Sequence, residues 1–363
     1  MGFNCGIVGL PNVGKSTLFN ALTETAAAQA MNYPFCTIEP NIGRVSVPDS
    51  RLFKLAEIAS SAKIIPTQIE IVDIAGLVKG ASNGEGLGNQ FLGHIRSTDA
   101  ILHIVRCFEN SDITHVNGSI DPIRDIEVVE TELILADLES LNKRLSNISK
   151  KNNPELTEEK NFLAKATEWL ESGKMLNQLK LTENEENFAS SIHLITKKPV
   201  LYVCNVNEND VVSGNSLTKQ VEQLVKNRNS QMVIVSAEIE SEIALIKDEK
   251  EKEEYIQSLG LSESGLSRVI RGGYNLLNLI TFFTAGPTEA HAWTVYKGAK
   301  APVAAGVIHT DFERGFICAE IISYDDYVTF NGELGAKNVG KMRLEGKDYI
   351  INDGDVVHFR FNV

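Results

Sequence analysis

A short motif near the N-terminus constrains this chain more than any other feature. The segment Gly9-Leu-Pro-Asn-Val-Gly14-Lys15-Ser16 matches G-x-x-x-x-G-K-[ST], and it lies between an apolar run at residues 5–8 and a helix-prone run at residues 17–22. Such a turn directs backbone N–H groups and the positive end of a helix at phosphate oxygens. The motif predicts a phosphate-binding loop in which Lys15 reaches the β- and γ-phosphates of a nucleoside triphosphate and Ser16 ligates Mg²⁺.

The chain around this motif has the alternation of an α/β fold. With 363 residues it is long enough for two or three domains. Short apolar runs that we expect to be strands alternate with helical segments, which predicts a mostly parallel sheet covered by helices on both faces. After residues 5–8, these runs are residues 69–72, 100–105, 200–204 and 232–235.

Between residues 121 and 195 the pattern becomes helical. Apolar residues recur at spacings of three and four, which is typical of a helical seam. They are Ile134, Leu138, Leu141, Leu145 and Ile148, followed after a break by Phe162, Ala166 and Trp169. We expect an inserted antiparallel coiled-coil-like arm, and the alternative is a helical subdomain packed on the core.

The last part of the chain, from about residue 278, predicts a small β-rich domain with one or two helices. Glycine, proline and an Asn-Asp-Gly turn separate its apolar runs. We expect strands at residues 281–283, 292–295, 315–322 and 356–361.

Two further signals lie between the phosphate motif and residue 77. Asp73-Ile-Ala-Gly76 follows an expected strand, so its carboxylate can hold the Mg²⁺ shell while the Gly76 N–H approaches the γ-phosphate. Thr37 lies in a proline-containing loop between the two motifs and is a candidate Mg²⁺ ligand. The order of the three signals favours this metal role of Thr37, and a D-x-x-G segment at this distance from the phosphate motif favours a GTPase-type switch core over a kinase-type one.

The base-recognition segment departs from the N-K-x-D pattern of guanine-specific proteins. Here it reads Asn205-Val206-Asn207-Glu208, with valine at the lysine position and glutamate at the aspartate position. We expect the longer Glu208 side chain to misalign a contact to guanine, and the Asn205 amide to meet the base edge. Ser236-Ala237-Glu238 occupies the place of the usual S-A-K loop. The segment therefore predicts weak guanine preference and makes adenine plausible.

The group that positions the attacking water is not evident from these motifs. Leu77 follows Gly76 where many such enzymes have glutamine, and leucine cannot orient water. Asn83, Glu85 and His115 are the alternatives. Asn12 is a candidate ligand for a monovalent cation such as K⁺.

Charge and cysteine content limit the classes of partner and compartment. The net charge of −13 argues against general nucleic-acid binding, although Lys337, Lys341, Arg343 and Lys347 supply a local basic segment that could meet phosphates or be a solvated loop. Five scattered cysteines fit a reducing cytosol, and the sequence shows neither a membrane-spanning run nor a secretory signal. We expect a cytoplasmic protein that does not contact membranes and is a monomer.

Long blocks of the sequence resemble the YchF subfamily of Obg-like ATPases. They include residues 1–20, the segment Asn32-Tyr-Pro-Phe-Cys-Thr-Ile-Glu-Pro-Asn41, and residues 73–82 and 84–92. The terminal Gly346-Lys-Asp-Tyr-Ile and Asp353-Gly-Asp355 also fit, so the resemblance runs from end to end.

The resemblance implies three domains and an activity. They are an Obg-type G domain at residues 1–120 and 196–277, a helical coiled-coil insertion at residues 121–195, and a TGS domain of β-grasp type at residues 278–363. It implies hydrolysis of ATP in preference to GTP, and binding to the ribosome through its large subunit. An Obg-type GTPase switch and a slow nucleotide-dependent binding module are the alternatives.

The resemblance also carries over site residues. It assigns His115 as the catalytic replacement for glutamine, and Ser16 and Thr37 as Mg²⁺ ligands. Nucleotide contacts carry over to Val206 and to Asn12, Val13, Gly14, Lys15, Ser16 and Thr17.

Overall fold

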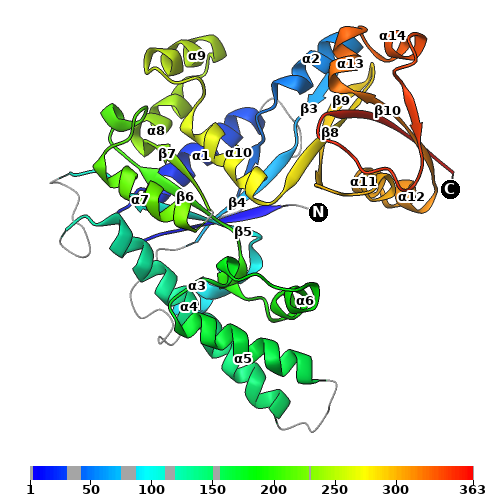
Figure 1. The fold of residues 1–363 in the computed structure, drawn as a ribbon. Helices are drawn as coiled ribbons and strands as arrows, with labels where there is room; N and C mark the ends of the chain where they lie inside the picture. The colour runs from blue at the N-terminus through cyan, green and yellow to red at the C-terminus, as the bar shows by residue number, and fades with distance from the viewer. Residues whose placement is uncertain are drawn as a thin grey trace.

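The computed structural model describes residues 3–30, 42–74, 87–110, 119–149, 156–228 and 230–362. The chain forms two six-stranded sheets joined by helices, with a helical hairpin projecting from the first sheet (Figure 1). Several residues that the sequence placed near the nucleotide lie outside the described part, namely Thr37, Gly76, Leu77, Asn83, Glu85 and His115.

The first sheet is mostly parallel, as predicted. Its order is β2-β4-β1-β5-β6-β7, and only the β2–β4 pair is antiparallel. All five runs that we expected to be strands lie in it. The strands are β1 (Asn4–Val8), β2 (Ile42–Ser46), β4 (Gln68–Asp73), β5 (Ala100–Arg106), β6 (Val200–Asn205) and β7 (Gln231–Val235).

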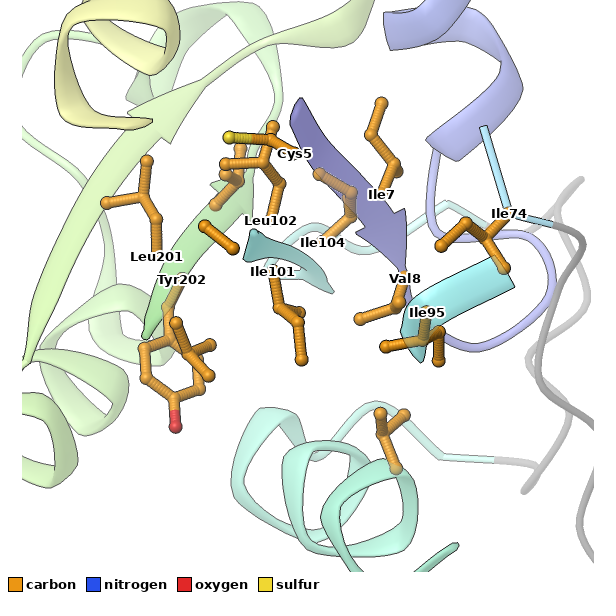
Figure 2. Packing of buried hydrophobic residues seen from close by; sticks show 14 of the residues in the cluster. Cys5, Ile7, Val8, Ile74, Ile95, Ile101, Leu102, Ile104, Leu201 and Tyr202 are labelled. Atoms are coloured by element: carbon orange, nitrogen blue, oxygen red, sulfur yellow. The ribbon is translucent and has the colours of Figure 1, made fainter. Parts of the chain in front are cut away.

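Helices cover both faces of this sheet because its strands are apolar on both sides. Cys5 and Leu102 point toward α10 (Gly265–Leu276), whose Gly273 lies against both side chains (Figure 2). Ile101 and Tyr202 point to the opposite face, toward α4. The other helices around the sheet are α1 (Lys15–Ala30), α3 (Leu87–Ser97), α7 (Ser216–Asn227), α8 (Ala237–Leu245) and α9 (Glu249–Ser258). Among the described residues, no helix combines the length and apolarity needed to cross a membrane.

The helical segment that we expected at residues 121–195 combines the two arrangements considered from sequence. The first half of α4 (Pro122–Ser149) packs on the sheet, and its second half pairs with α5 (Thr157–Glu171) as a hairpin that projects outward (Figure 1). The predicted seam is buried or half-buried along both helices. The return path consists of η3 (Leu176–Gln178), α6 (Glu183–Ile192) and η4 (Ile195–Lys197).

The second sheet has the order β11-β10-β12-β8-β9-β3, with a parallel pair, β12 and β8, at its centre. Four of its strands coincide with predicted runs, namely β8 (Leu279–Ala285), β9 (Glu289–Tyr296), β10 (Phe316–Ser323) and β12 (Asp355–Phe361); β11 (Arg343–Glu345) was not predicted. We expected one or two helices here, and the structure has four short ones because polar turns break the helical stretches. They are α11 (Ala301–Ile308), α12 (Thr310–Arg314), α13 (Tyr324–Thr329) and α14 (Glu333–Asn338).

An early segment of the chain crosses into this second sheet. Helix α2 (Ser50–Ala59) covers one face of it, and β3 (Lys63–Ile65) pairs in parallel with β9 at its edge. The boundaries drawn from sequence had placed residues 50–65 with the first sheet. Because β2 and β4 flank this segment as a hairpin, the first sheet is covalently connected to the second at this point.

Candidate nucleotide-binding site

The phosphate-binding motif forms the turn that its sequence predicts. β1 ends at Val8, the turn follows, and α1 begins at Lys15. Two glycines are required by this backbone. Gly9 has a φ of +155, and a Cβ at this position would collide with the Ile104 carbonyl. Gly14 has a φ of +97, and a Cβ there would collide with the Asn205 amide. The turn therefore presents its backbone N–H groups and the N-terminus of α1 to the same side.

The Lys15 side chain folds back onto the start of the phosphate-binding turn. Its side chain is buried, and its ammonium donates to the carbonyls of Gly9 at 3.0 Å and Leu10 at 2.6 Å. Burial lowers the pKa of Lys15 to about 8, and the charge of Asp73 opposes this shift. Burial likewise raises the pKa of Asp73, which ends β4, and Lys15 opposes it. The charges of Lys15 and Asp73 thus influence each other beside the turn.

Ser16 and Thr17 follow Lys15 in the first turn of α1. Both side chains are exposed, so a ligand at the turn can reach the Ser16 hydroxyl. The hydroxyl and the Asp73 carboxylate are hard oxygen donors of the kind that Mg²⁺ prefers.

Asn205 connects the phosphate turn to the base loop. Its side chain is buried, its amide nitrogen donates to the Val13 carbonyl at 3.0 Å, and its amide oxygen accepts from the Ala237 N–H at 2.9 Å. We had expected this amide to meet the base edge. In the structure its oxygen and one of its N–H groups are used by the protein, so Asn205 holds the two loops in register.

A cavity of about 650 Å³ lies beside this connection. The phosphate turn supplies one side of it, and the segments after β6 and β7 supply another. The predicted residues in its wall are Asn12, Gly14, Thr17, Asn205, Val206, Ala237 and Glu238. The structure thus brings the phosphate motif and both base-loop motifs to one cavity at the carboxyl ends of the parallel strands.

Two residues predicted in the base loops do not line this cavity. Glu208 is exposed at the start of η5 (Glu208–Asp210), and the wall of the cavity includes neighbouring Asn207 instead. Ser236 is fully buried under the start of α8, and its hydroxyl has no hydrogen-bond partner among the described residues. The Val13 side chain is buried in the core, so this residue contributes its backbone to the site.

Besides Asn207, sequence reasoning missed four residues in the cavity wall. Ser241 and Glu242 lie one turn into α8, and Phe108 and Asn110 lie just beyond β5. Phe108 and Asn110 were detectable in principle, because the segment after a central parallel strand emerges at the same edge as the phosphate turn. No sequence motif identifies these residues, because the fold brings them to the cavity and no fixed spacing relates them to the other site residues.

The local basic segment of the last domain is partly neutralised. Lys341 forms an ion pair with Asp326 at 3.3 Å, and Arg343 lies 3.8 Å from Glu345 and 3.9 Å from Asp355. Lys337 and Lys347 are exposed. This segment therefore has less net positive charge than its sequence suggested.

Sequence comparison now identifies the family. A protein from Haemophilus ducreyi named "Ribosome-binding ATPase YchF" is 57% identical over 366 residues, with both chains covered completely. Proteins of the same name from Escherichia coli O157:H7 and Bacillus subtilis are 54% and 52% identical, again with complete coverage. The chain belongs to the YchF family.

Structure and family models agree with this assignment. The solved YchF GTPase of Schizosaccharomyces pombe superimposes with a TM-score of 0.89 at 37% identity, covering 99% of this chain and 98% of that one. The model described as "50S ribosome-binding GTPase" matches residues 4–157, and YchF-GTPase_C, described as "Protein of unknown function (DUF933)", matches residues 279–362. The YchF fold therefore extends over both sheets and the helical insertion.

Proposed function

We propose that this chain is a cytoplasmic ATPase that uses Mg²⁺, prefers ATP to GTP, and binds the ribosome according to its nucleotide state. YchF relatives that match it over their full length are named ribosome-binding ATPases. The proposed preference for ATP rests on which residues line the part of the cavity that would receive the base. Val206 lines it where guanine-specific proteins have lysine, and Glu208 points to solvent outside it.

The hydrogen bonding of the base loop supports the same preference. The Ala237 N–H already donates to Asn205, which reduces its capacity to donate to the O6 carbonyl of guanine. The apolar Val206 side chain can pack against the face of either purine. The carboxylate of Glu238 in the wall can accept a hydrogen bond from an amino group such as adenine N6. A guanine-selective contact from Glu208 requires this exposed segment to move.

The phosphate side of the site supplies positioning and charge. In our proposal the turn from Asn12 to Thr17 holds the phosphates through its N–H groups, and Lys15 moves from the Gly9 and Leu10 carbonyls to the β- and γ-phosphates. Ser16 and Thr37 would ligate Mg²⁺, with Asp73 supporting its shell. When bound, the ion neutralises charge that develops on the transferred phosphoryl group.

The catalytic base or water-positioning group stays a prediction. Leu77 cannot orient water, and we assign the role to His115, which follows the Phe108–Asn110 wall of the cavity by five residues. Gly76 would donate its N–H to the γ-phosphate. Asn12, exposed in the turn with φ 61, is our candidate for binding K⁺.

We also propose three domains. The first sheet and its helices form the G domain, residues 121–195 form a helical insertion, and residues 278–363 form a TGS domain of β-grasp type. The central parallel pair β8–β12 and helix α11 against one face support a β-grasp arrangement. Ribosome binding, through the large subunit, would use surfaces outside the nucleotide cavity.

The test is steady-state hydrolysis of ATP and of GTP with Mg²⁺, with and without purified large ribosomal subunits. We expect higher turnover of ATP, stimulation by the subunits, and a loss of roughly a hundredfold or more in Lys15→Ala, because a charge that stabilises the transition state is removed. Equal or faster GTP turnover would favour the Obg-type GTPase switch instead. Negligible turnover of both nucleotides, with tight binding, would favour the binding module.

Two variations address the assignments within the site. His115→Ala should reduce kcat while leaving the Kd for ATP unchanged, and an unchanged kcat would remove His115 from the mechanism. Replacing K⁺ by Na⁺ or choline should lower turnover if Asn12 holds K⁺. Equal rates in the three salts would contradict that role.

A further inference from the structure

The wall of the nucleotide cavity formed by Phe108 and Asn110 is held from behind by one buried cation. Arg106 ends β5, and only 1% of its surface is exposed. Its Nε donates to the Phe108 carbonyl at 3.2 Å, and one terminal nitrogen donates to the Asn110 carbonyl at 3.3 Å. Its guanidinium carbon also lies 4.6 Å from the centre of the Phe108 ring.

A buried guanidinium is costly unless it is well supported, which argues that this arrangement has a specific role. Burial lowers the pKa of Arg106, and the carboxylate of Asp125 opposes this shift. Asp125 is itself buried in the first turn of α4. The cation therefore lies between the cavity wall and the base of the helical insertion.

The other side of the same segment is also fixed. The Cys107 N–H donates to the Asn205 carbonyl at 2.8 Å, and the Asn215 amide donates to the Cys107 carbonyl at 2.8 Å. Cys107 is thus tied to the base loop and to the start of α7, and Arg106 holds the next residues of the segment, Phe108 and Asn110. Arginine suits this task because its rigid fork reaches two carbonyls and stacks on a ring at once.

We propose that Arg106 is a positioning residue for nucleotide binding, because it sets the placement of Phe108 and Asn110 in the cavity wall. This inference rests on the proposed function, since it assumes that the cavity receives a nucleoside triphosphate. Arg106 acts behind the wall, so its loss should weaken ground-state binding more than it slows the chemical step.

The experiment measures the Kd for a fluorescent ATP analogue, together with KM and kcat for ATP, in Arg106→Met and Arg106→Lys. We expect Arg106→Met to raise Kd and KM about tenfold, because two hydrogen bonds and a ring contact are lost, while kcat changes about twofold or less. Arg106→Lys keeps the charge but not the fork, and should show a smaller increase of roughly threefold.

Arg228→Met is the matched control. Arg228 is also a largely buried arginine that ties the first sheet to α4, through Glu130 and through the Tyr202 hydroxyl at 3.0 Å, but neither of these partners lines the cavity. We expect this variant to lower the melting temperature while its Kd for the analogue stays within about twofold of the wild type.

The outcomes separate the two proposals. If wild-type protein does not bind the analogue, the proposed function fails. If it binds normally and folded Arg106→Met binds equally well, or if Arg228→Met weakens binding as much, the role of Arg106 is contradicted. Should Arg106→Met not fold, an unchanged Kd in Arg106→Lys would overturn the inference.

Discussion

The helical insertion and the C-terminal region (residues 279–362) are attached to the first sheet in different ways. Apolar side chains of the insertion, such as Val129 and Leu133, belong to the same core as the strands of the first sheet. The second sheet has its own apolar clusters, one on each face. The insertion therefore extends the core of the nucleotide-binding part, whereas the C-terminal region is a separate core joined to it.

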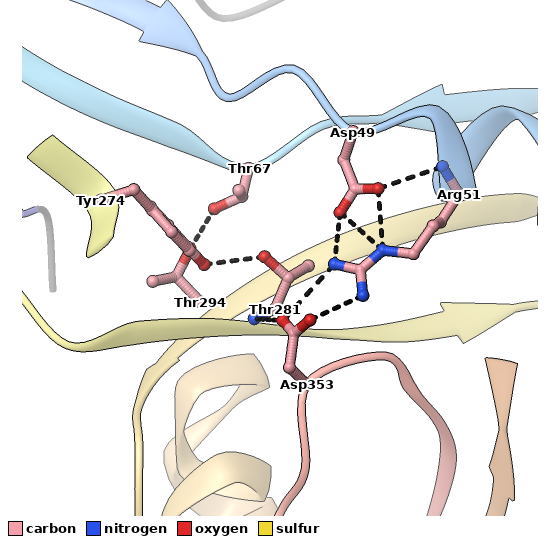
Figure 3. A network of polar contacts seen from close by, with 7 residues as sticks. All are labelled: Asp49, Arg51, Thr67, Tyr274, Thr281, Thr294 and Asp353. Carbon is pink, nitrogen blue, oxygen red and sulfur yellow. Dashed lines mark hydrogen bonds and ion pairs between the residues drawn. The ribbon is translucent and has the colours of Figure 1, made fainter. Parts of the chain in front are cut away.

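A network of polar contacts lies where the C-terminal region is connected to the rest of the chain (Figure 3). Arg51 binds Asp49 at 2.7 Å and Asp353 at 2.7 Å, and Asp353 accepts from the Thr281 N–H at 2.9 Å. Nearby, the Tyr274 hydroxyl, from α10, lies 2.8 Å from the Thr281 hydroxyl. Contacts of this kind can be exchanged at low cost, while a shared apolar core cannot be opened without losing burial. Motion of the insertion should thus reach the nucleotide cavity more directly than motion of the C-terminal region.

The largest expected effect on stability comes from the buried hydrogen bonds that connect α4 to the end of the insertion. Asp137 of α4 is fully buried and accepts from the N–H groups of Ile195 and Thr196, at 3.0 and 2.7 Å, and from the Thr196 hydroxyl at 2.6 Å. Asp137→Ala should lower the free energy of unfolding by about 3 kcal/mol, because three donors lose their acceptor in an apolar setting. Urea denaturation measures this, and Asp137→Asn, which keeps one oxygen, should lose less. A loss below about 1 kcal/mol in the alanine variant would contradict the shared-core account.

The next effect is an acid sensitivity that arises on the α4 side of the first sheet. His103 of β5 is buried near Tyr202, and burial, with the charges of Arg228 and Lys15, lowers its pKa to about 3. The unfolded chain, with an ordinary histidine pKa, then binds more protons than the folded one between about pH 6.5 and pH 3. The contribution to stability is complete above pH 6.5 and is lost as the pH falls toward 3.

Between pH 7 and pH 5 this loss should amount to about 2 kcal/mol. It is measured as the difference between urea denaturation of the wild type and of His103→Leu, which has similar volume and cannot titrate. If the two proteins lose stability in parallel over this range, the histidine does not contribute, and the acid sensitivity belongs to other groups.

The smallest effect on stability should come from the polar network around Arg51. Arg51→Ala breaks a half-exposed network, so we expect a loss of only about 1 kcal/mol in the stability of the C-terminal region, with an unchanged Kd for ATP. Hydrogen exchange at the Thr281 amide, whose acceptor Asp353 is released, should report it. Lys300→Ala, which breaks the exposed pair with Asp348 in the same region, is the control and should have almost no effect. A large change in ATP affinity on losing Arg51 would contradict the separation of the two regions.

The contrast also explains what the sequence could predict. Buried strands such as β1 and β5 appear as apolar runs, and the phosphate turn has a motif because phosphate geometry requires its glycines. Strand β3 is three residues long and mostly accessible, and its partner β9 lies more than two hundred residues away, so no local pattern could place it in the second sheet.

The same reasoning applies within the nucleotide site. Its residue types were largely predicted, but the direction of two side chains was not. Asn205 faces Val13 and Ala237, and Glu208 faces solvent, because the packing of β6 against the phosphate turn decides their orientation. Arg106 could not be found from sequence, since an arginine at a strand end is usually solvated.

Calorimetric titration of the protein with ATP and with GTP in Mg²⁺ would show whether the cavity selects adenine nucleotides, as we propose. We predict tighter binding of ATP in the wild type, and a shift of this preference toward GTP in the double variant Val206→Lys with Glu208→Asp. Tighter binding of GTP by the wild type would contradict the account.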